Sequence, residues 1–216
     1  MTPRILIFDI ETSPIKGFAW TKYDATIFKI EEDWFMLSFS AKWLGGSFEN
    51  KALCDYEGYS RHKHNDKELV QDMWKLFDQA DILVAHNGDK FDIKKVNARF
   101  SYWGLTPPSP YKTVDTLKIA RQHFGFTSNS LKDLALHLEL DQKMDTGGKD
   151  LWFDCMNGDM EAWKKMKKYN KQDVVVLEEI YKRFLPYMKH PNLNLWAEEM
   201  VDRLRFWGNY RQNLEL

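Results

Sequence analysis

Two acidic side chains stand at the end of the first apolar run of the chain. Residues 4–10 form an almost continuous β-branched and aromatic run, which predicts a strand buried on both faces, and Asp9 and Glu11 lie at its carboxyl end. Residues i and i+2 of a strand point to the same face, so the two carboxylates converge. Like charges this close repel each other unless a cation neutralises them, and Mg²⁺ takes oxygen ligands. The pair predicts a divalent-metal site, with an ordinary exposed strand end as the alternative.

A second polar motif, His-Asn-Gly-Asp-Lys-Phe-Asp at residues 86–92, follows a buried run and opens a helical pattern. Ligands tend to bind where the strands of an α/β sheet end. Asn87 could contact a substrate or form a local turn, and Phe91 could stack on a base or pack in the core. Asp89 and Asp92 compete for one role, because both favour a helix start. Plain helix capping is the alternative for this motif.

A tyrosine and an aspartate lie four residues apart in a long helical pattern that runs over residues 159–185. Tyr169 and Asp173 share a face, because positions i and i+4 of a helix are neighbours. A phenol one turn from a metal-binding carboxylate can hold a water beside the metal. The other Tyr-x₃-Asp spacing, Tyr111 to Asp115, falls in a predicted strand and is ranked lower, although Asp115 could support the site from that strand.

The apolar periodicity predicts the elements that must position these groups. Three strands open the chain and are expected to pair antiparallel, with Gly45-Gly46 in a hairpin between the last two. A helix start of the capping-box type at 65–68 then begins an alternation of helices and strands, which is typical of a mixed α/β sheet with helices on both faces. Residues 139–158 are polar and predict a loop. The predicted strands are 4–10, 34–43, 48–54, 82–85 and 112–114, and the predicted helices are 65–77, 90–102, 116–123, 131–138, 159–185 and 195–207.

The three motifs occur together, in order and on matching elements, and they resemble the DEDD family of 3′–5′ exonucleases, which has an RNase H-like fold. The first is Phe8-Asp9-Ile10-Glu11-Thr12, the second runs from Asn87 to Asp92, and the third is Tyr169 with Asp173. A tyrosine four residues before the last aspartate is the pattern of the DEDDy subgroup. The first motif is similar to that of the proofreading domain of family B DNA polymerases. The resemblance covers residues 4–188 and implies an RNase H-like mixed sheet, its first three strands antiparallel and the others parallel.

The resemblance implies phosphodiester hydrolysis with two divalent cations, Mg²⁺ or Mn²⁺, about 4 Å apart. The implied metal ligands are Asp9 as the bridge between the ions, Glu11 and Asp173 at the first ion, and Asp92 at the second. Tyr169 is expected to orient the attacking water, since its ordinary pKa of about 10 makes it a poor base at neutral pH.

Four further side chains are candidates for binding the substrate. Thr12, Asn87 and Phe91 are expected to grip the terminal nucleotide by backbone or hydroxyl contact, hydrogen bonding and stacking respectively. Lys165 lies one helical turn before Tyr169 in a dense basic stretch and could receive substrate phosphates. A solvated helix face is the alternative for this lysine.

The chain has 216 residues, 31 of them basic and 32 acidic, and two distant cysteines that exclude a zinc ribbon or a disulfide framework. Residues 1–190 are expected to form the exonuclease domain and 191–216 a helical extension packed on it. This length leaves no room for a polymerase, so a free-standing exonuclease is expected. No run approaches the roughly 18 apolar residues of a membrane span, and the N-terminus lacks a signal peptide, so a cytoplasmic protein without membrane contact is expected.

The expected substrate is the 3′ end of DNA, single-stranded or frayed, which would be released as nucleoside monophosphates. Replication or repair partners are expected. The alternatives are an exoribonuclease of the same family, an RNase H-like endonuclease, and a domain that binds nucleic acid without cutting it. A net charge of −1 does not exclude a polyanionic partner, because bound cations would cancel the charges of the acidic site.

Overall fold

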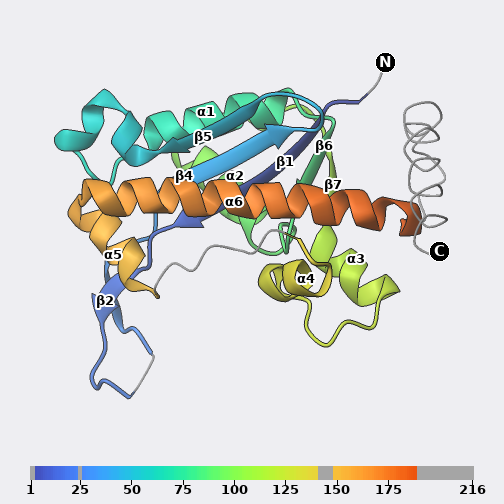
Figure 1. Cartoon of the computed structure of the whole chain (residues 1–216). Helices are drawn as coiled ribbons and strands as arrows, with labels where there is room; N and C mark the ends of the chain where they lie inside the picture. The colour runs from blue at the N-terminus through green and yellow to red at the C-terminus, as the bar shows by residue number, and fades with distance from the viewer. Residues whose placement is uncertain (1–2, 24–25, 141–147, 189–216) are drawn as a thin grey trace.

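The core of the protein is a five-stranded mixed sheet with the strand order β5-β4-β1-β6-β7 (Figure 1). The computed structural model describes residues 3–23, 26–140 and 148–188. β5, β4 and β1 pair antiparallel, whereas β1, β6 and β7 pair parallel. This confirms the mixed α/β sheet predicted from the sequence. The strands are β1 (Ile5–Thr12), β4 (Met36–Trp43), β5 (Phe48–Ala52), β6 (Ile82–Ala85) and β7 (Lys112–Asp115).

Helices cover both faces of this sheet. The long helix α6 crosses one face, and α1 and α2 lie behind the other (Figure 1). The described helices are α1 (Lys67–Asp78), α2 (Asp92–Tyr102), α3 (Thr116–His123), α4 (Leu131–His137), α5 (Asp150–Asn157) and α6 (Met160–Phe184). None of them is both long enough and apolar enough to cross a bilayer, among the residues that the structure describes.

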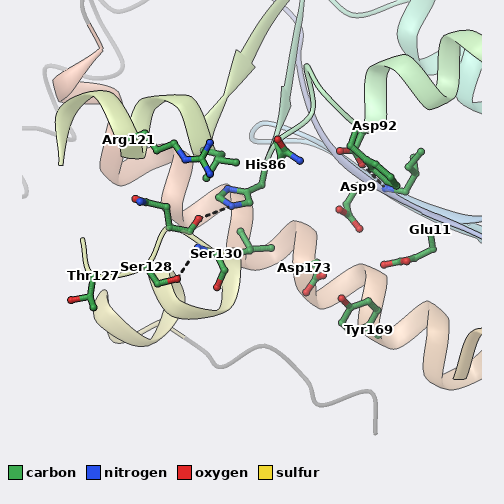
Figure 2. A pocket seen from close by; sticks show the side chains of 16 residues that line it. Asp9, Glu11, His86, Asp92, Arg121, Thr127, Ser128, Ser130, Tyr169 and Asp173 are labelled. Carbon is green, nitrogen blue, oxygen red and sulfur yellow. Dashed lines mark hydrogen bonds between the residues drawn. The ribbon is translucent and has the colours of Figure 1, made fainter. Parts of the chain in front are cut away.

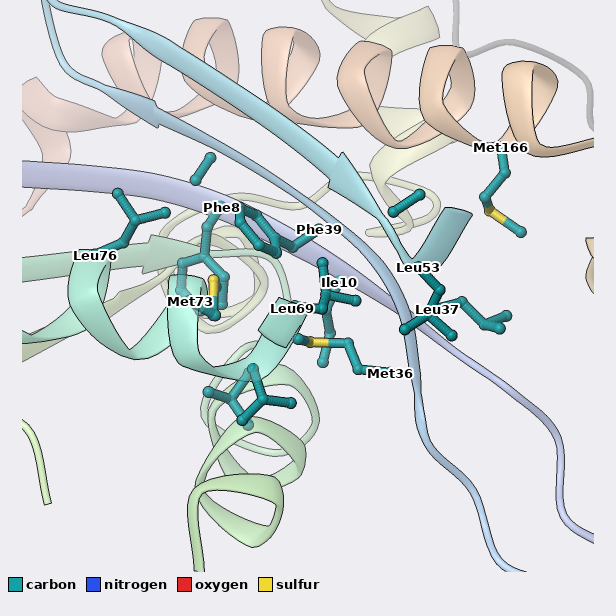
Figure 3. Close-up of a cluster of buried hydrophobic side chains, with 14 of the residues drawn as sticks. Phe8, Ile10, Met36, Leu37, Phe39, Leu53, Leu69, Met73, Leu76 and Met166 are labelled. Carbon is teal, nitrogen blue, oxygen red and sulfur yellow. The ribbon is translucent and has the colours of Figure 1, made fainter. Parts of the chain in front are cut away.

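The alternation of side chains along β1 decides which of them reach the site. Leu6, Phe8 and Ile10 belong to the larger core cluster, of which Figure 3 labels Phe8 and Ile10. Phe8 meets the edge of Phe77 of α1 at 5.0 Å between ring centroids. Ile5 and Ile7 instead pack with residues of α6. Because the period of a strand is two, Asp9 and Glu11 continue the row of Ile5 and Ile7. The sequence pattern of β1 thus turns its two carboxylates toward α6.

The start of α1 differs from the predicted capping box. Asp66 precedes the helix but accepts no hydrogen bond from its first turn, and Asn65 accepts one from Lys67 N at 3.1 Å instead. The buried Asp66 carboxylate binds the Arg99 guanidinium through two hydrogen bonds of 2.7 and 2.5 Å. It also accepts from Trp103 Nε1 at 2.7 Å and from a backbone N–H of β4 at 2.8 Å. A buried carboxylate needs such partners, so Asp66 ties α1, α2 and the sheet together.

The β2–β3 hairpin and the helix α5 were not predicted from the sequence. β2 (Lys16–Phe18) and β3 (Lys29–Glu32) form a separate antiparallel hairpin after β1, and its strands are exposed and short. The loop predicted for residues 139–158 is wrong in its second half, where α5 lies. Burial of Leu151 and Cys155 stabilises this two-turn helix, a tertiary contact that local composition does not reveal.

The predicted helix 195–207 and the C-terminal extension 191–216 lie outside the described residues. The domain boundary at residue 190 therefore stays a prediction.

Candidate active site

Three carboxylates from two elements converge beside the sheet. Asp9 and Glu11 come from β1 and Asp173 from α6, and one oxygen of each lies within 4.8 Å of the others (Figure 2). Asp173 is buried, while Asp9 and Glu11 are partly exposed. Three negative charges this close strongly favour a bound cation. The structure therefore brings the first and third sequence motifs into one cluster.

Two neutral side chains hold the strand carboxylates in place. Asn170, buried on α6, donates through Nδ2 to Asp9 Oδ2 at 2.6 Å, and its own Oδ1 accepts from Ser38 Oγ at 3.4 Å. Trp152 of α5 donates through Nε1 to Glu11 Oε2 at 3.0 Å. Neither residue was predicted from the sequence. The spacing of Asn170 three residues before Asp173 on a helix could have revealed it, but Trp152 could not be found without α5.

Tyr169 lies one turn before Asp173 on α6 and hydrogen-bonds to it. The ring is buried and meets the edge of Trp152 at 6.0 Å between centroids. Burial raises the pKa of the phenol above its ordinary value, and the charges of Asp173, Glu11 and Asp9 raise it further. Tyr169 therefore stays protonated at neutral pH and acts as a hydrogen-bond donor.

Asp92 is the first residue of α2, is only 3% exposed, and accepts a hydrogen bond from Ile10 N at 3.3 Å. Burial raises the pKa of its carboxyl to about 7, the hydrogen bonds from Ile10 and its own backbone oppose the shift, and the charge of Asp115 adds to it. The competing Asp89 instead forms an ion pair with Lys118 at 2.5 Å. Of the two candidates, Asp92 is the one that faces the cluster (Figure 2).

The turn between β6 and α2 is held by the end of β7. Asn87 adopts a left-handed backbone with φ of 64°, and its N–H donates to Asp115 Oδ1 at 2.9 Å. A side chain at Gly88 would place its Cβ 2.4 Å from Ala85 Cβ, so this tight turn requires glycine. Asp115 also accepts from Leu117 N at 3.0 Å and so caps α3. It supports the second motif from the neighbouring strand rather than joining the three clustered carboxylates.

These groups line an open pocket of about 690 Å³. Asp9, Glu11, Asp92, Tyr169 and Asp173 form one side of it (Figure 2). Of the predicted substrate contacts, the half-exposed Phe91 and Asn87 line the pocket as well. Thr12 and Lys165 are not among its lining residues; Thr12 pairs with Met36 at the end of β1, and Lys165 is exposed on α6.

The opposite wall comes from α3 and the loop before α4, and it was not predicted from the sequence. It contains a cation, three hydroxyls and an amide, and its members include Arg121, Thr127, Ser128, Asn129 and Ser130 (Figure 2). His86 connects this wall to β6, because its ring nitrogens hydrogen-bond Thr116 Oγ1 at 2.9 Å and Asn129 O at 3.0 Å. The polar run 127–130 predicts a loop, but nothing in its sequence places it opposite β1.

The basic stretch near Tyr169 is largely engaged with the protein itself. Lys164 pairs with Glu161 at 2.6 Å, and Lys167 pairs with Asp55 at 2.7 Å. Lys171 lies over the Phe48 ring at 5.2 Å. These contacts indicate that Lys164, Lys167 and Lys171 bind other parts of the protein. A phosphate contact at Lys165 stays a prediction.

The donor set of the pocket fits a hard divalent cation. Its candidate ligands are carboxylate oxygens, which Mg²⁺ and Mn²⁺ prefer, and no histidine or cysteine belongs to the cluster found in the described part of the chain. Asp9, Glu11 and Asp173 would hold such an ion, and Asp92 lines the same pocket. Burial, the main cause of the raised pKa of Asp92, disfavours its charged form, and a bound cation would favour that form.

Comparison with known proteins gives one family match, and it covers most of the chain. Residues 26–185 match the family model of the RNase_H superfamily. This range includes the second and third motifs and the strands beside β1.

Two curated proteins align with parts of the chain. A DNA polymerase III PolC-type of Ureaplasma parvum serovar 3 is 31% identical over 117 residues, which are 54% of this chain and 8% of that protein. Protein NEN3 of Arabidopsis thaliana is 29% identical over 73 residues, 34% of this chain and 14% of that protein. The chain thus spans a small part of the length of both relatives.

Among solved structures, the family B DNA polymerase from the hyperthermophilic archaeon Pyrobaculum calidifontis superimposes with a TM-score of 0.63. The superposition covers 86% of this chain and 25% of the polymerase, at 18% sequence identity. At this identity the similarity concerns the fold, and it agrees with the RNase H-like sheet expected from the sequence.

Proposed function

The chain belongs to the RNase H superfamily, and from this membership and its carboxylate site we propose that it is a metal-dependent 3′–5′ exonuclease of the DEDDy type acting on DNA. The observation that carries the proposal is the convergence of Asp9, Glu11 and Asp173, with Tyr169 and Asp92 in the same open pocket. An exonuclease needs an accessible pocket that ends at its metal ligands, because only a chain end then reaches them.

Two divalent cations, Mg²⁺ or Mn²⁺, would supply an activated water and stabilise charge on the attacking and leaving oxygens. Asp9, Glu11 and Asp173 would hold one, and Asp92 would help to hold the other. Trp152 and Asn170 act as positioning residues, because they fix the orientation of Glu11 and Asp9 through hydrogen bonds of 3.0 and 2.6 Å. Hydrogen bonds of this kind orient metal ligands and strengthen metal binding in general.

Tyr169 would orient the attacking water by donating or accepting a hydrogen bond beside Asp173. Its raised pKa argues against a role as the base that removes the proton of that water. The burial of its ring against Trp152 keeps the hydroxyl in one place. Fixed orientation rather than proton transfer is thus its contribution.

The pocket walls suit a terminal nucleotide. Phe91 offers a half-exposed ring for base stacking, and Asn87 offers an amide for hydrogen bonding. On the opposite wall, Arg121 provides a guanidinium that can bind a phosphate, while Ser128 and Ser130 provide hydroxyls. DNA as the substrate is supported by the similarity to the DNA polymerase III PolC-type of Ureaplasma parvum.

The proposal is tested by the direction of cleavage. Single-stranded DNA labelled at its 5′ end should give a ladder that shortens from the 3′ end when Mg²⁺ or Mn²⁺ is present, and no products when EDTA is present. A matched RNA strand should be degraded more slowly. Cleavage of a circular single strand would contradict the proposal, because a circle has no end to enter the pocket.

A further inference from the structure

The hairpin of β2 and β3 carries an unusual number of exposed aromatic rings. Figure 1 shows the hairpin extending away from the five-stranded sheet. Trp20 and Tyr23 are 80% and 86% exposed, and Phe18 and Phe28 are about half exposed. Trp20 stacks on Phe28 with 4.6 Å between ring centroids and an angle of 17° between planes. The hairpin therefore presents flat ring faces to solvent, where burial in the protein does not explain them.

Lysines outnumber acidic residues around these rings. Residues 15–30 contain three lysines and one acidic residue, Asp24. Lys22 Nζ lies 4.8 Å from the centroid of the Tyr23 ring, and Lys29 Nζ lies 6.0 Å from that of Phe18. At the base of the hairpin, Glu31 pairs with Lys16 at 3.1 Å. The outer hairpin thus combines apolar ring faces with a small excess of positive charge.

The base of the hairpin is fixed to the body of the protein. Ser13, directly after β1, and Phe35, directly before β4, exchange hydrogen bonds of 2.9 and 3.0 Å. The Phe35 ring stacks on His64 at 4.7 Å, and His64 also contacts Glu32 of β3. Within the hairpin, Gly17 is needed for close pairing, since a Cβ there would lie 2.7 Å from Lys29 O. The hairpin is therefore an ordered element whose base is fixed beside β1, the strand that carries Asp9 and Glu11.

A row of side chains connects this hairpin to the pocket. Phe91 lines the pocket, and Lys95 Nζ lies 5.7 Å from the centroid of its ring. The same ammonium lies 3.6 Å from the centroid of the Trp34 ring, and Trp34 follows β3 by two residues. We call Phe91, Lys95, Trp34, Phe28 and Trp20 the aromatic track. Lys95 joins the rings of Phe91 and Trp34, and Trp20 stacks on Phe28 in the hairpin that Trp34 follows.

We propose that the aromatic track binds the single-stranded nucleic acid that leads into the pocket. Each base offers a flat face to an aromatic ring, and each phosphate offers a charge to a lysine, so single strands bind such surfaces without regard to sequence. The positive charge of the outer hairpin distinguishes this occupant from an apolar protein partner. The inference rests on the proposed function, because it assigns the path of the strand whose 3′ end reaches the carboxylates.

The test compares a long and a short substrate in the double variant Trp20→Ala/Phe28→Ala. Affinity for a labelled oligothymidylate of about 20 nucleotides, longer than a typical single-strand site, is measured by fluorescence anisotropy in EDTA. The dissociation constant should rise by at least about tenfold, since the loss of a single base stack weakens binding by that order. The kcat/KM for a trinucleotide, measured with Mg²⁺, should not change, because a trinucleotide ends before the hairpin.

Two further variants make the result specific. Tyr187→Ala removes a half-exposed ring from the far end of α6 and should change neither readout. Lys95→Gln removes the cation between pocket and hairpin and should lower the salt dependence of binding to the long strand.

Unchanged affinity of the double variant for the long strand would overturn the proposal. An equally large fall in kcat/KM for the trinucleotide would overturn it too. A change in the oligomeric state of the free double variant, measured by sedimentation, would also overturn it, because a second copy would then cover the hairpin. If the wild-type protein fails to cleave the trinucleotide, the proposed exonuclease function fails instead. The binding measurement in EDTA is independent of that outcome.

Discussion

At the scale of single residues, the site depends on where a few side chains lie along regular elements. The period of two along β1 places Asp9 and Glu11 on one face, and the period of α6 places Tyr169, Asn170 and Asp173 against them. These spacings are local properties, so the sequence alone predicted that Asp9 and Glu11 share a strand face and that Tyr169 and Asp173 share a helix face. It did not predict the hydrogen bonds from Asn170 and Trp152, because these bonds join residues far apart in the chain.

Replacing Tyr169 with phenylalanine tests the orienting role of its hydroxyl. Tyr169→Phe keeps the buried ring but removes the hydrogen bond to Asp173. We expect kcat to fall by about 10–100-fold, less than the loss of a group that transfers a reacting proton, because Tyr169 only orients the water, while the Mg²⁺ concentration for half-maximal rate stays the same. Tyr181→Phe on the same helix, buried in the core instead, is the matched control. Equal rates for Tyr169→Phe and the wild type would exclude the role.

At the scale of elements, the parts that the sequence predicted are those with strong internal patterns. The apolar strands β1 and β6 and the long amphipathic α6 were predicted close to their observed bounds. The hairpin of β2 and β3 was missed because its strands are short and bury little apolar surface. α5 was missed because tertiary contacts rather than composition stabilise it. Of the missed elements, α5 reaches the site through Trp152, and there tertiary contacts override local propensity.

The helix α5 contributes to the site through one side chain, and this can be measured. Trp152→Phe removes the hydrogen bond to Glu11 Oε2 and keeps an aromatic ring beside Tyr169. We expect kcat/KM to fall by about tenfold and the Mg²⁺ requirement to rise, as is usual when a partner of a metal ligand is lost.

The neighbouring Phe153 is half-exposed on the same helix and gives the control Phe153→Leu, which should behave like the wild type. If Trp152→Phe and Phe153→Leu have the same activity and the same Mg²⁺ requirement, α5 only packs against the site.

At the scale of the whole molecule, the fold was predicted more completely than the pocket. Three short motifs led to an RNase H-like mixed sheet, and the sheet order and the family match confirm it. The wall around Arg121 and Ser130 was not predictable, because its distance from β1 is set by the packing of α3 and α4 on α6. Of the four predicted substrate contacts, the structure places Asn87 and Phe91 at the pocket and leaves Thr12 and Lys165 outside its lining.

The charge of the chain is explained at the same scale. A net charge of −1 conceals an acidic pocket and an aromatic hairpin whose outer residues 15–30 contain three lysines and one aspartate. Cations bound at the carboxylates would reverse the local field that a nucleic acid meets. Replication or repair partners and a cytoplasmic location stay predictions.

The most direct test of the central claim is the rate of nucleotide release from the 3′ end of single-stranded DNA by the variant Asp173→Asn. This change keeps the size of the side chain and removes one of the three clustered charges. The control Glu179→Gln alters a half-exposed carboxylate on the same helix, which pairs with Lys182 instead. We predict that Asp173→Asn loses at least about 10³-fold in rate, on the scale of groups that hold a catalytic metal, with a circular dichroism spectrum like that of the wild type, and that Glu179→Gln keeps its activity. Near wild-type release by Asp173→Asn would contradict the assignment of this pocket as the active site.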